Sequence, residues 1–302
     1  MRLSAMNRVL DVAVAISLVG FLCACEADPE DQARSPTPSA IAKPAQTASS
    51  EPEIGRMDSI IKQHKQRMAE AEGREGILAE QRLYSVFDEE LIIRDFFQDR
   101  REGFFLDVGC SEPVKGSNTY YLEKHLGWSG IGIDALVDYR EAWLAKRKNS
   151  RFFAYLVTDR SGVQATFFKS PGLGISSTNQ AWASGKAFGA NLKTEELQIE
   201  SITLNDLLDR ENVTKIDLLA MDIEGHEPQA LAGFDIERFS PELVVVEKSI
   251  GPRKNNAVRR YFEARGYRMI ERYVPFDPVN RYFERRSGDS AGEFPIPLSG
   301  RI

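Results

Sequence analysis

Cysteine and histidine are scarce in this sequence, with only three residues of each among 302. Cys23 and Cys25 fall in an apolar run near the N-terminus, so Cys110 is the one cysteine of the region that we expect to fold. This excludes a disulfide framework and a cysteine zinc site. Because the histidines also lack a specific metal-binding spacing, we predict no metal ion in the protein.

Net positive charge is missing as well. The formal net charge is -6 and the isoelectric point is about 5.4. Proteins that bind nucleic acid usually carry a basic face. We therefore predict a small molecule, and not a nucleic acid, as the main partner.

The sequence has no apolar run of full membrane-spanning length. Val12–Ala24 is nearly unbroken in its apolar character but too short to predict a span. Basic residues precede it, and Leu22–Cys25 resembles a bacterial lipobox, so residues 1–25 predict a signal peptide with Cys25 lipidated, or a short uncleaved membrane anchor. Either would associate the protein with a membrane through its N-terminus. The alternative is a translation start at Met57, which predicts a cytoplasmic protein.

The rest of the chain divides by composition. Residues 26–56 are rich in proline, alanine, serine, threonine and acids, which is typical of a disordered linker. Residues 57–101 place apolar residues at loose helical spacing among many charges and predict a helical N-terminal extension that could cover a ligand. Residues 102–302 have the length of one α/β domain.

A phosphate-binding loop is absent where a nucleotide-binding sheet would carry one. The apolar strand predicted at Phe104–Val108 contains Asp107 and leads into Gly109, which lets the backbone turn close to a ligand. Cys110 and Ser111 follow, in place of the further glycines of G-x-G-x-x-G. This turn suits S-adenosylmethionine, which has an adenosine but no phosphate, better than NAD or ATP. We predict that these four residues contact that cofactor.

The second predicted strand ends on Asp134, a little over twenty residues after the glycine turn. An acid at this place can accept hydrogen bonds from both hydroxyls of a ribose. We predict that Asp134 binds the ribose and that Ala135 contacts the cofactor beside it. Asn118 precedes a predicted helix start at Tyr120, where it binds the cofactor's carboxylate, caps the helix with Thr119, or does both.

The third predicted strand, Phe152–Val157, ends at Thr158 and Asp159. In a Rossmann-like sheet that tip lies near the adenine, so we predict cofactor contacts from both Thr158 and Asp159. The alternative is that Asp159 serves only the turn that follows it.

Carboxylates cluster after the fourth predicted strand, Ile216–Met221. If the strand pleat continues, Asp222 and Glu224 face the same side at the edge where ligands bind. We predict Asp222, Glu224 and His226 as catalytic residues, with Asp222 also contacting the cofactor. The alternative is that these acids only precede a helix and interact with its dipole.

The remaining pattern completes the fold prediction. A helix is predicted from the Thr203 cap to about Arg210, a buried strand at Leu243–Glu247, and a helix at about Asn256–Arg265. Strands near Tyr267–Tyr273 and Arg281–Glu284 predict a closing antiparallel hairpin. The fold class is α/β, a Rossmann-like seven-stranded sheet of the class I methyltransferase type, mostly parallel with a C-terminal antiparallel hairpin.

These segments together resemble the FkbM-type methyltransferases, a family of S-adenosylmethionine-dependent enzymes. The resemblance runs from about Phe104 to Arg285 and is carried by Leu106–Gly109, Ser117–Thr119 with Leu122 and Glu123, Gly127–Gly130, Asp134, Thr203–Asp206 and Met221–Gly225. It implies a methyltransferase domain over residues 102–302, cofactor contacts at Asp107, Gly109, Asp134, Thr158 and Asp159, and Asp222 and Glu224 near the transferred methyl. The family's usual activity, O-methylation of a hydroxyl on a sugar or other small metabolite, is the implied function.

The sequence departs from the family pattern at two places. Cys110–Pro113 replaces the commoner alanine, asparagine, acid and glycine, and Ala220 stands where the family often has lysine. Export would also separate the domain from a cytosolic cofactor. The alternative function is therefore a membrane-tethered, catalytically inactive Rossmann-like binding protein.

Overall fold

The computed structural model describes residues 84–86, 89–170, 174–186, 189–248, 252–274, 276–277 and 279–286. The predicted signal peptide or anchor with Cys25, the linker at 26–56, and residues 57–83 of the predicted helical extension lie outside these described residues. Within the described part of the chain, no helix combines the length and the apolar character needed to cross a bilayer.

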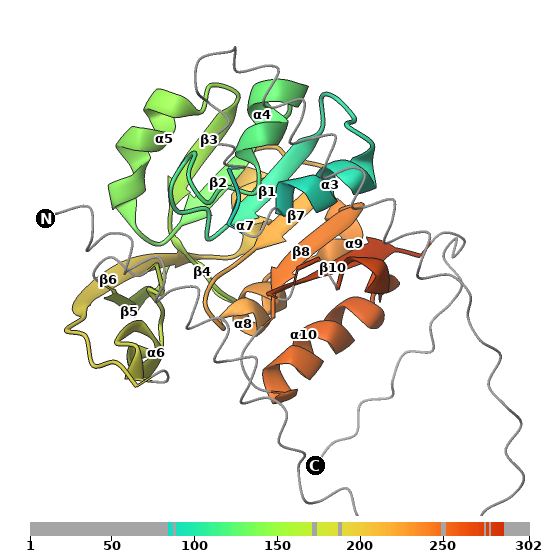
Figure 1. Cartoon of the computed structure of the whole chain (residues 1–302). Helices are drawn as coiled ribbons and strands as arrows, with labels where there is room; N and C mark the ends of the chain where they lie inside the picture. The colour runs from blue at the N-terminus through green and yellow to red at the C-terminus, as the bar shows by residue number, and fades with distance from the viewer. Residues whose placement is uncertain are drawn as a thin grey trace, which may run out of the picture.

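A seven-stranded sheet with the order β3-β2-β1-β7-β8-β10-β9 forms the centre of the fold (Figure 1). Its parallel strands are β3 (Ser150–Ala154), β2 (Ser129–Asp134), β1 (Phe104–Val108), β7 (Leu218–Met221) and β8 (Leu243–Glu247). β10 (Asn280–Arg285) is antiparallel to both β8 and β9 (Tyr267–Met269). The predicted fold class is confirmed.

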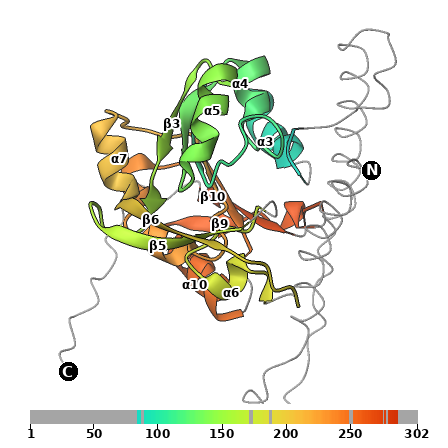
Figure 2. The same ribbon diagram turned by 90° about the vertical axis from the view of Figure 1, so that its left-hand side faces the viewer.

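Alternation along these strands builds one core on each face of the sheet. Leu106 and Val108 join a core with residues of α7 (Leu204–Arg210), α8 (Glu227–Ala232), α9 (Ile236–Phe239) and α10 (Pro252–Glu263). Phe105 points to the other face, which is covered by α3 (Glu89–Phe97), α4 (Tyr120–Leu126) and α5 (Arg140–Lys146). Figure 2 shows α3, α4 and α5 grouped together, with α7 and α10 away from them.

A second, three-stranded sheet was not predicted. It has the order β4-β6-β5, from β4 (Leu156–Val157), β6 (Glu195–Ile202) and β5 (Gln164–Lys169). Together with α6 (Gln180–Ala183), the β5–β6 pair projects from the left side of the main sheet in Figure 1 and faces the viewer in Figure 2. This segment supplies one wall of the cavity described below.

The third strand differs from its predicted course. β3 ends at Ala154, and the chain then crosses to the second sheet, where Leu156 and Val157 pair with β6. The backbone N–H of Tyr155 donates to the carbonyl of Asp134 at the crossing, 2.9 Å away. The continuous strand predicted at Phe152–Val157 is therefore wrong, because its second half has a different partner.

The predicted helices are present, with shifted ends and one different cap. Thr203 caps α7 by accepting from the backbone N–H of Asp206 at 3.0 Å, as predicted. Thr119 precedes α4 but does not cap it; instead Ser117 Oγ accepts from the backbone N–H of Tyr120 at 3.2 Å. The last predicted helix begins at Pro252, earlier than Asn256.

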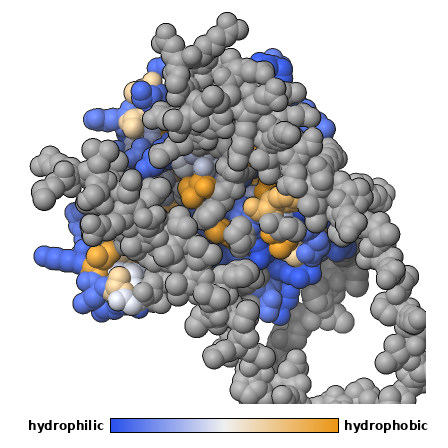
Figure 3. Space-filling model, viewed as in Figure 1, coloured by the Kyte–Doolittle hydropathy of each residue, from blue (hydrophilic) through white to orange (hydrophobic). Residues whose placement is uncertain are grey.

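The described surface has few large exposed apolar residues, namely Val86, Val137, Leu144 and Val163. In Figure 3 the coloured part of one face is largely hydrophilic, with small separate hydrophobic patches. Exposed apolar residues that occur singly are normal for globular proteins.

Gly109 follows β1 and packs against the backbone of Asp222, the residue that follows β7. Its φ is +82°, and a Cβ atom there would lie 1.8 Å from the carbonyl oxygen of Asp222. We expect Gly109→Ala to lower the thermal stability sharply or to prevent folding, because backbone atoms cannot yield to the added methyl group. Gly162→Ala is the matched control: its φ of +76° is similar, but nothing lies within 4 Å. Only the backbone strain of about 1–2 kcal/mol applies there. Equal thermal stability of the two variants would contradict this account.

Candidate active site

The carboxyl ends of β1, β2 and β7 open into a cavity of about 830 Å³. Ligands bind at this edge in open α/β sheets. Most of the residues predicted as a site line the cavity: Asp107, Gly109, Cys110, Ser111, Asn118, Asp134, Ala135, Asp222, Glu224 and His226. Tyr84, Ser85 and Val86, which precede α3, also line it, and the Tyr84 carbonyl accepts from the backbone N–H of Gly116 at 2.6 Å.

Thr158 and Asp159 are not among the lining residues. The Thr158 hydroxyl donates to Asp159 at 3.2 Å, and the Thr158 backbone N–H donates to the Ile202 carbonyl at 3.0 Å. Because the chain leaves the main sheet after Ala154, the cavity wall at this point is formed by Tyr155, Leu156 and Val157 instead. The structure therefore does not bring this predicted pair to the cavity.

Asp134 ends β2 with its carboxylate held by the backbone. Its Oδ2 accepts from the N–H of Ser111 at 3.0 Å and its Oδ1 from the N–H of Leu136 at 2.8 Å. Burial raises its pKa to about 6 against these hydrogen bonds, which lower it. Since the two oxygens of a carboxylate can together accept about four hydrogen bonds, the Asp134 carboxylate keeps capacity for a ribose hydroxyl.

An apolar wall lies next to this carboxylate. Leu136, Leu156 and Phe167 pack together and line the cavity. An aromatic base fits against such a surface. A polar group for the ribose and an apolar wall for the adenine are therefore adjacent.

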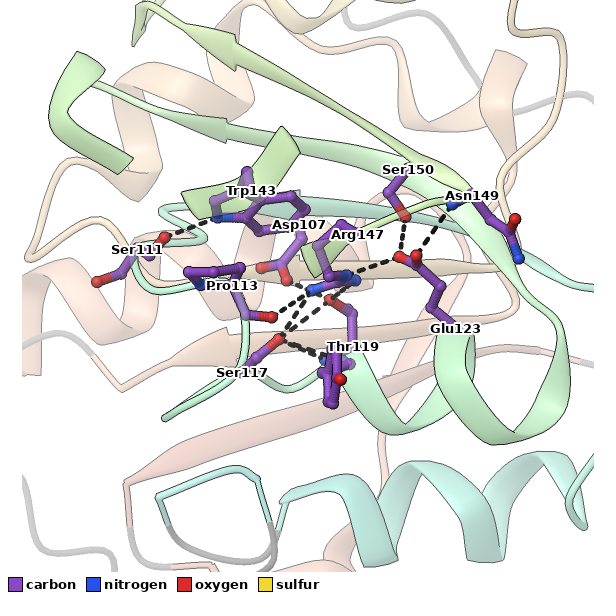
Figure 4. A network of polar contacts seen from close by, with 11 residues as sticks. Asp107, Ser111, Pro113, Ser117, Thr119, Glu123, Trp143, Arg147, Asn149 and Ser150 are labelled. Atoms are coloured by element: carbon purple, nitrogen blue, oxygen red, sulfur yellow. Dashed lines mark hydrogen bonds and ion pairs between the residues drawn. The ribbon is translucent and has the colours of Figure 1, made fainter. Parts of the chain in front are cut away.

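Arg147 organises the loop between β1 and α4 (Figure 4). Its fully buried guanidinium forms an ion pair with Glu123, with Nε 2.6 Å from Oε2. It also donates to the Pro113 carbonyl at 3.0 Å and to Thr119 Oγ1 at 3.0 Å. Thr119 in turn donates to Asp107 Oδ2 at 2.6 Å. The departure at Pro113 is thus accommodated, because its carbonyl is part of this network.

Trp143 fixes the same loop from α5. Its indole N–H donates to the carbonyl of Ser111 at 2.8 Å, and its ring lies 4.3 Å from the Arg147 guanidinium carbon. Cys110 is buried against Trp143. Burial and the nearby charges of Asp107 and Asp134 raise the pKa of the Cys110 thiol, so it stays protonated and is not a nucleophile.

Carboxyl groups also converge after β7. Met221 pairs with Val246 in the parallel ladder, which sets Asp222 beside Glu247, and these two carboxyl groups are hydrogen bonded. Desolvation by the surrounding protein and the charge of Glu227 raise the pKa of Asp222 to about 6. The Asp222 side chain is nevertheless exposed and faces the cavity. Burial and the charge of Asp222 raise the pKa of Glu247 as well.

Glu224 reaches the cavity through a turn and not through a continued strand. β7 ends at Met221, and Glu224 has a φ of +56°, so the predicted strand pleat does not persist. The indole N–H of Trp182, on α6, donates to Glu224 Oε2 at 2.5 Å. Burial and the charge of Asp222 nevertheless raise the pKa of Glu224. Positive φ at a residue other than glycine is strained, and such strain is frequent at functional sites.

The neighbouring Glu227 and His226 have different surroundings. Glu227 is fully buried and accepts from the backbone N–H groups of Ile223 at 3.3 Å and Gly225 at 3.1 Å, so it stabilises the turn. His226 lines the cavity, with Nδ1 3.2 Å from the hydroxyl of Thr178. Of these two, only His226 is placed to meet a ligand.

The charge of the lining favours a cationic ligand. Asp107, Glu112, Asp134, Asp222 and Glu224 line the cavity, whereas Lys115 is the only lysine or arginine among the described lining residues. A sulfonium and an ammonium group are attracted by this set, while a pyrophosphate is repelled. The residues therefore fit S-adenosylmethionine. In the described part of the chain, no group of three or more histidines, cysteines or acids is arranged to hold a metal ion.

Comparison with known families agrees with this geometry. Residues 107–269, more than half of the chain, match the methyltransferase FkbM domain. The chain belongs to the FkbM methyltransferase family. It is accordingly an S-adenosylmethionine-dependent methyltransferase, and S-adenosylmethionine is its cofactor. A search of curated proteins found no significant match.

Several solved structures are similar to this FkbM methyltransferase at low identity. A TehB-like SAM-dependent methyltransferase from Corynebacterium glutamicum is 14% identical, with 74% of this chain and 100% of that chain covered and a TM-score of 0.39. The fibrillarin pre-rRNA processing protein of Methanococcus jannaschii is 12% identical, with 63% and 69% covered and a TM-score of 0.35. MtNAS in complex with MTA and tNA is 8% identical, with 78% and 74% covered and a TM-score of 0.31. We draw nothing further from TM-scores this low.

Arg147 and Trp182 of this FkbM methyltransferase were not predicted as functional. Arg147 lies in the run Lys146–Lys148, which is typical of a solvated surface, and no local signal marks it as buried. Trp182 lies in the segment whose strands were not predicted. The available signal for a functional residue in that segment was a single tryptophan among small and polar residues.

The Arg147 ion pair gives a stability prediction. We expect Arg147→Met to lower the free energy of unfolding by roughly 3–5 kcal/mol, because Glu123 is left buried without its partner. Urea unfolding of the full chain measures this. Arg151→Met is the matched control: Arg151 pairs with Glu211 but is half exposed, so the loss is about 0–1 kcal/mol. Similar losses in the two variants would show that the buried network does not stabilise the fold.

Proposed function

We propose that this methyltransferase transfers the methyl group to a hydroxyl oxygen of a sugar or another small metabolite. The observation that supports this best is the carboxylate of Glu224, whose pKa is raised and which lines the cavity that fits the cofactor. A sugar hydroxyl is weakly acidic, so a base of raised pKa helps to remove its proton during attack. The partner of the protein is then a small-molecule acceptor.

Bound S-adenosylmethionine supplies an electrophilic methyl group on a sulfonium. Asp134 would hold its ribose, and Asp107 and Asp222 would supply negative charge for its sulfonium and ammonium groups. Glu224 orients the acceptor hydroxyl and takes its proton, with His226 as the alternative base. Alignment is the main requirement of an in-line displacement, so the rigid loop held by Arg147 matters as much as the base.

Membrane association through the N-terminal segment stays part of our proposal, as does the alternative of a cytoplasmic protein starting at Met57. The alternative function, a membrane-tethered and catalytically inactive binding protein, predicts cofactor or ligand binding without any methyl transfer. The two predictions below separate binding from transfer.

Cofactor affinity is expected to depend on pH. Asp134 and Asp222 both have a pKa of about 6, and the cofactor's donor and cationic groups favour their ionised forms. Affinity is therefore full above about pH 7 and falls at least tenfold at pH 5, since one pKa unit corresponds to about 1.4 kcal/mol. Calorimetric titration of the full chain with S-adenosylmethionine measures this.

Asp134→Asn should weaken binding roughly tenfold or more at pH 7.5 and flatten the pH dependence. A wild-type affinity that is constant from pH 5 to 7.5 contradicts the ribose assignment.

Glu224→Gln separates binding from turnover. We expect the cofactor affinity to change by less than about threefold, while methyl transfer falls roughly 100-fold or more because the base is lost. Transfer of labelled methyl from the cofactor to a panel of hydroxyl acceptors, with calorimetry on the same preparation, measures both. A wild-type rate in this variant would remove Glu224 from the mechanism.

A further inference from the structure

A second cavity of about 430 Å³ adjoins the cofactor cavity. Thr178, Glu224 and His226 line both, so the two cavities meet at these residues. The second cavity is bounded by the α6 segment on one side and by the ends of β7 and β8 on the other. Ser177, Asn179, Trp182, Gly225, Gln229 and Glu247 complete its lining.

The carboxyl groups are divided between the two cavities. Asp222 lines only the first, Glu247 lines only the second, and Glu224 lines both. This division follows from the sheet, because Asp222 ends β7 and Glu247 ends the neighbouring strand β8, one step farther from Asp134. A molecule in the second cavity would therefore meet a ligand of the first cavity on the side of Glu224.

The lining of the second cavity accepts hydrogen bonds and offers no positive charge from lysine or arginine. Glu224 and Glu247 contribute carboxyl groups, and no lysine or arginine occurs among its described lining residues. Lys248 follows Glu247 in the chain but is not one of them. A buried phosphate or carboxylate here would have no cation to pair with, and burial of an unpaired charge is costly.

Trp182 connects this cavity to the candidate base. Asn179 caps α6 by accepting from the backbone N–H groups of Ala181 at 3.0 Å and Trp182 at 3.3 Å, which fixes the start of the helix. The indole N–H then holds Glu224 Oε2. With its N–H used in this way, the indole offers its ring to a ligand, and aromatic faces attract cations and the apolar faces of polyols.

We propose that the second cavity binds the methyl acceptor and selects a molecule with hydroxyl or ammonium donors and no phosphate or carboxylate group. Trp182 acts as a positioning residue for Glu224 in this site. That the bound molecule is the methyl acceptor rests on the proposed function. The charge selectivity of the cavity can be tested without any methyl transfer.

Fluorescence provides a direct test, because the three tryptophans of the protein differ in exposure. Trp128 and Trp143 are at most 1% exposed, whereas Trp182 is half-buried and lines the cavity. The difference between wild-type and Trp182→Phe spectra isolates the Trp182 emission. We expect caesium to quench this emission at least threefold more effectively than iodide, and Glu247→Lys to reduce that ratio. Glu196→Lys, at an exposed acid on β6 that lines neither cavity, is the matched control and should leave the ratio unchanged.

Small probes then test the ligand class. Glucose and glucosamine should change the Trp182 emission of the full chain, glucosamine at lower concentration, while glucose 6-phosphate binds at least tenfold more weakly. Glu247→Lys should reduce that discrimination against glucose 6-phosphate, with circular dichroism and thermal unfolding as checks of folding. Equal quenching by iodide and caesium, equal binding of the phosphate probe, or no response to either uncharged or amino sugar would each overturn the proposal. If the wild-type protein shows these quenching and binding results but transfers no methyl group to any acceptor, the proposed function is contradicted and the ligand selectivity of the cavity is not.

Discussion

The guanidinium of Arg147 is buried between α4, α5 and the loop that follows β1, and its charge has to be balanced there. Glu123 balances it, while Thr119 and the Pro113 carbonyl use the remaining donors. A fully satisfied buried ion pair adds little net stability compared with an apolar core, but it penalises every arrangement in which one partner is lost. The loop that carries Gly109 and Ser111 is therefore held in one conformation. The hydrogen bond from Ser111 to Asp134 depends on that conformation, and so does the shape of the cavity.

The parts of the site that could be predicted from sequence are those with a local cause. Asp107, Asp134 and Asp222 each stand at the end of a short apolar strand, and parallel strands bring their carboxyl ends to one edge. Gly109 was recognisable because only glycine tolerates a backbone contact as close as the one with Asp222. The apolar runs also predicted the seven strands, and the C-terminal hairpin indicated a sheet of the class I methyltransferase type.

The parts that could not be predicted depend on distant partners. β6 reads Glu-Glu-Leu-Gln-Ile-Glu-Ser-Ile, and its half-exposed pattern becomes a strand only through pairing with β5 and β4. That pairing draws Leu156 and Val157 away from the main sheet, which is why Thr158 and Asp159 do not reach the cavity. Arg147 appears between two lysines, and its burial results from an acid 24 residues away in sequence. Thr119 precedes a helix, yet its hydroxyl bonds Asp107 instead of the helix N-terminus.

The concentration of acids in the cavity links binding to stability. Asp107, Asp134, Asp222 and Glu224 all have raised pKa values, so their ionised forms are disfavoured when no cation is near. A lysine among them would stabilise the empty fold, but it would also repel a sulfonium. A cationic ligand instead supplies the missing positive charge and lowers these pKa values. The electrostatic repulsion that it removes adds to its binding free energy. The same carboxyl groups that weaken the empty protein thus give the site its preference for a cation.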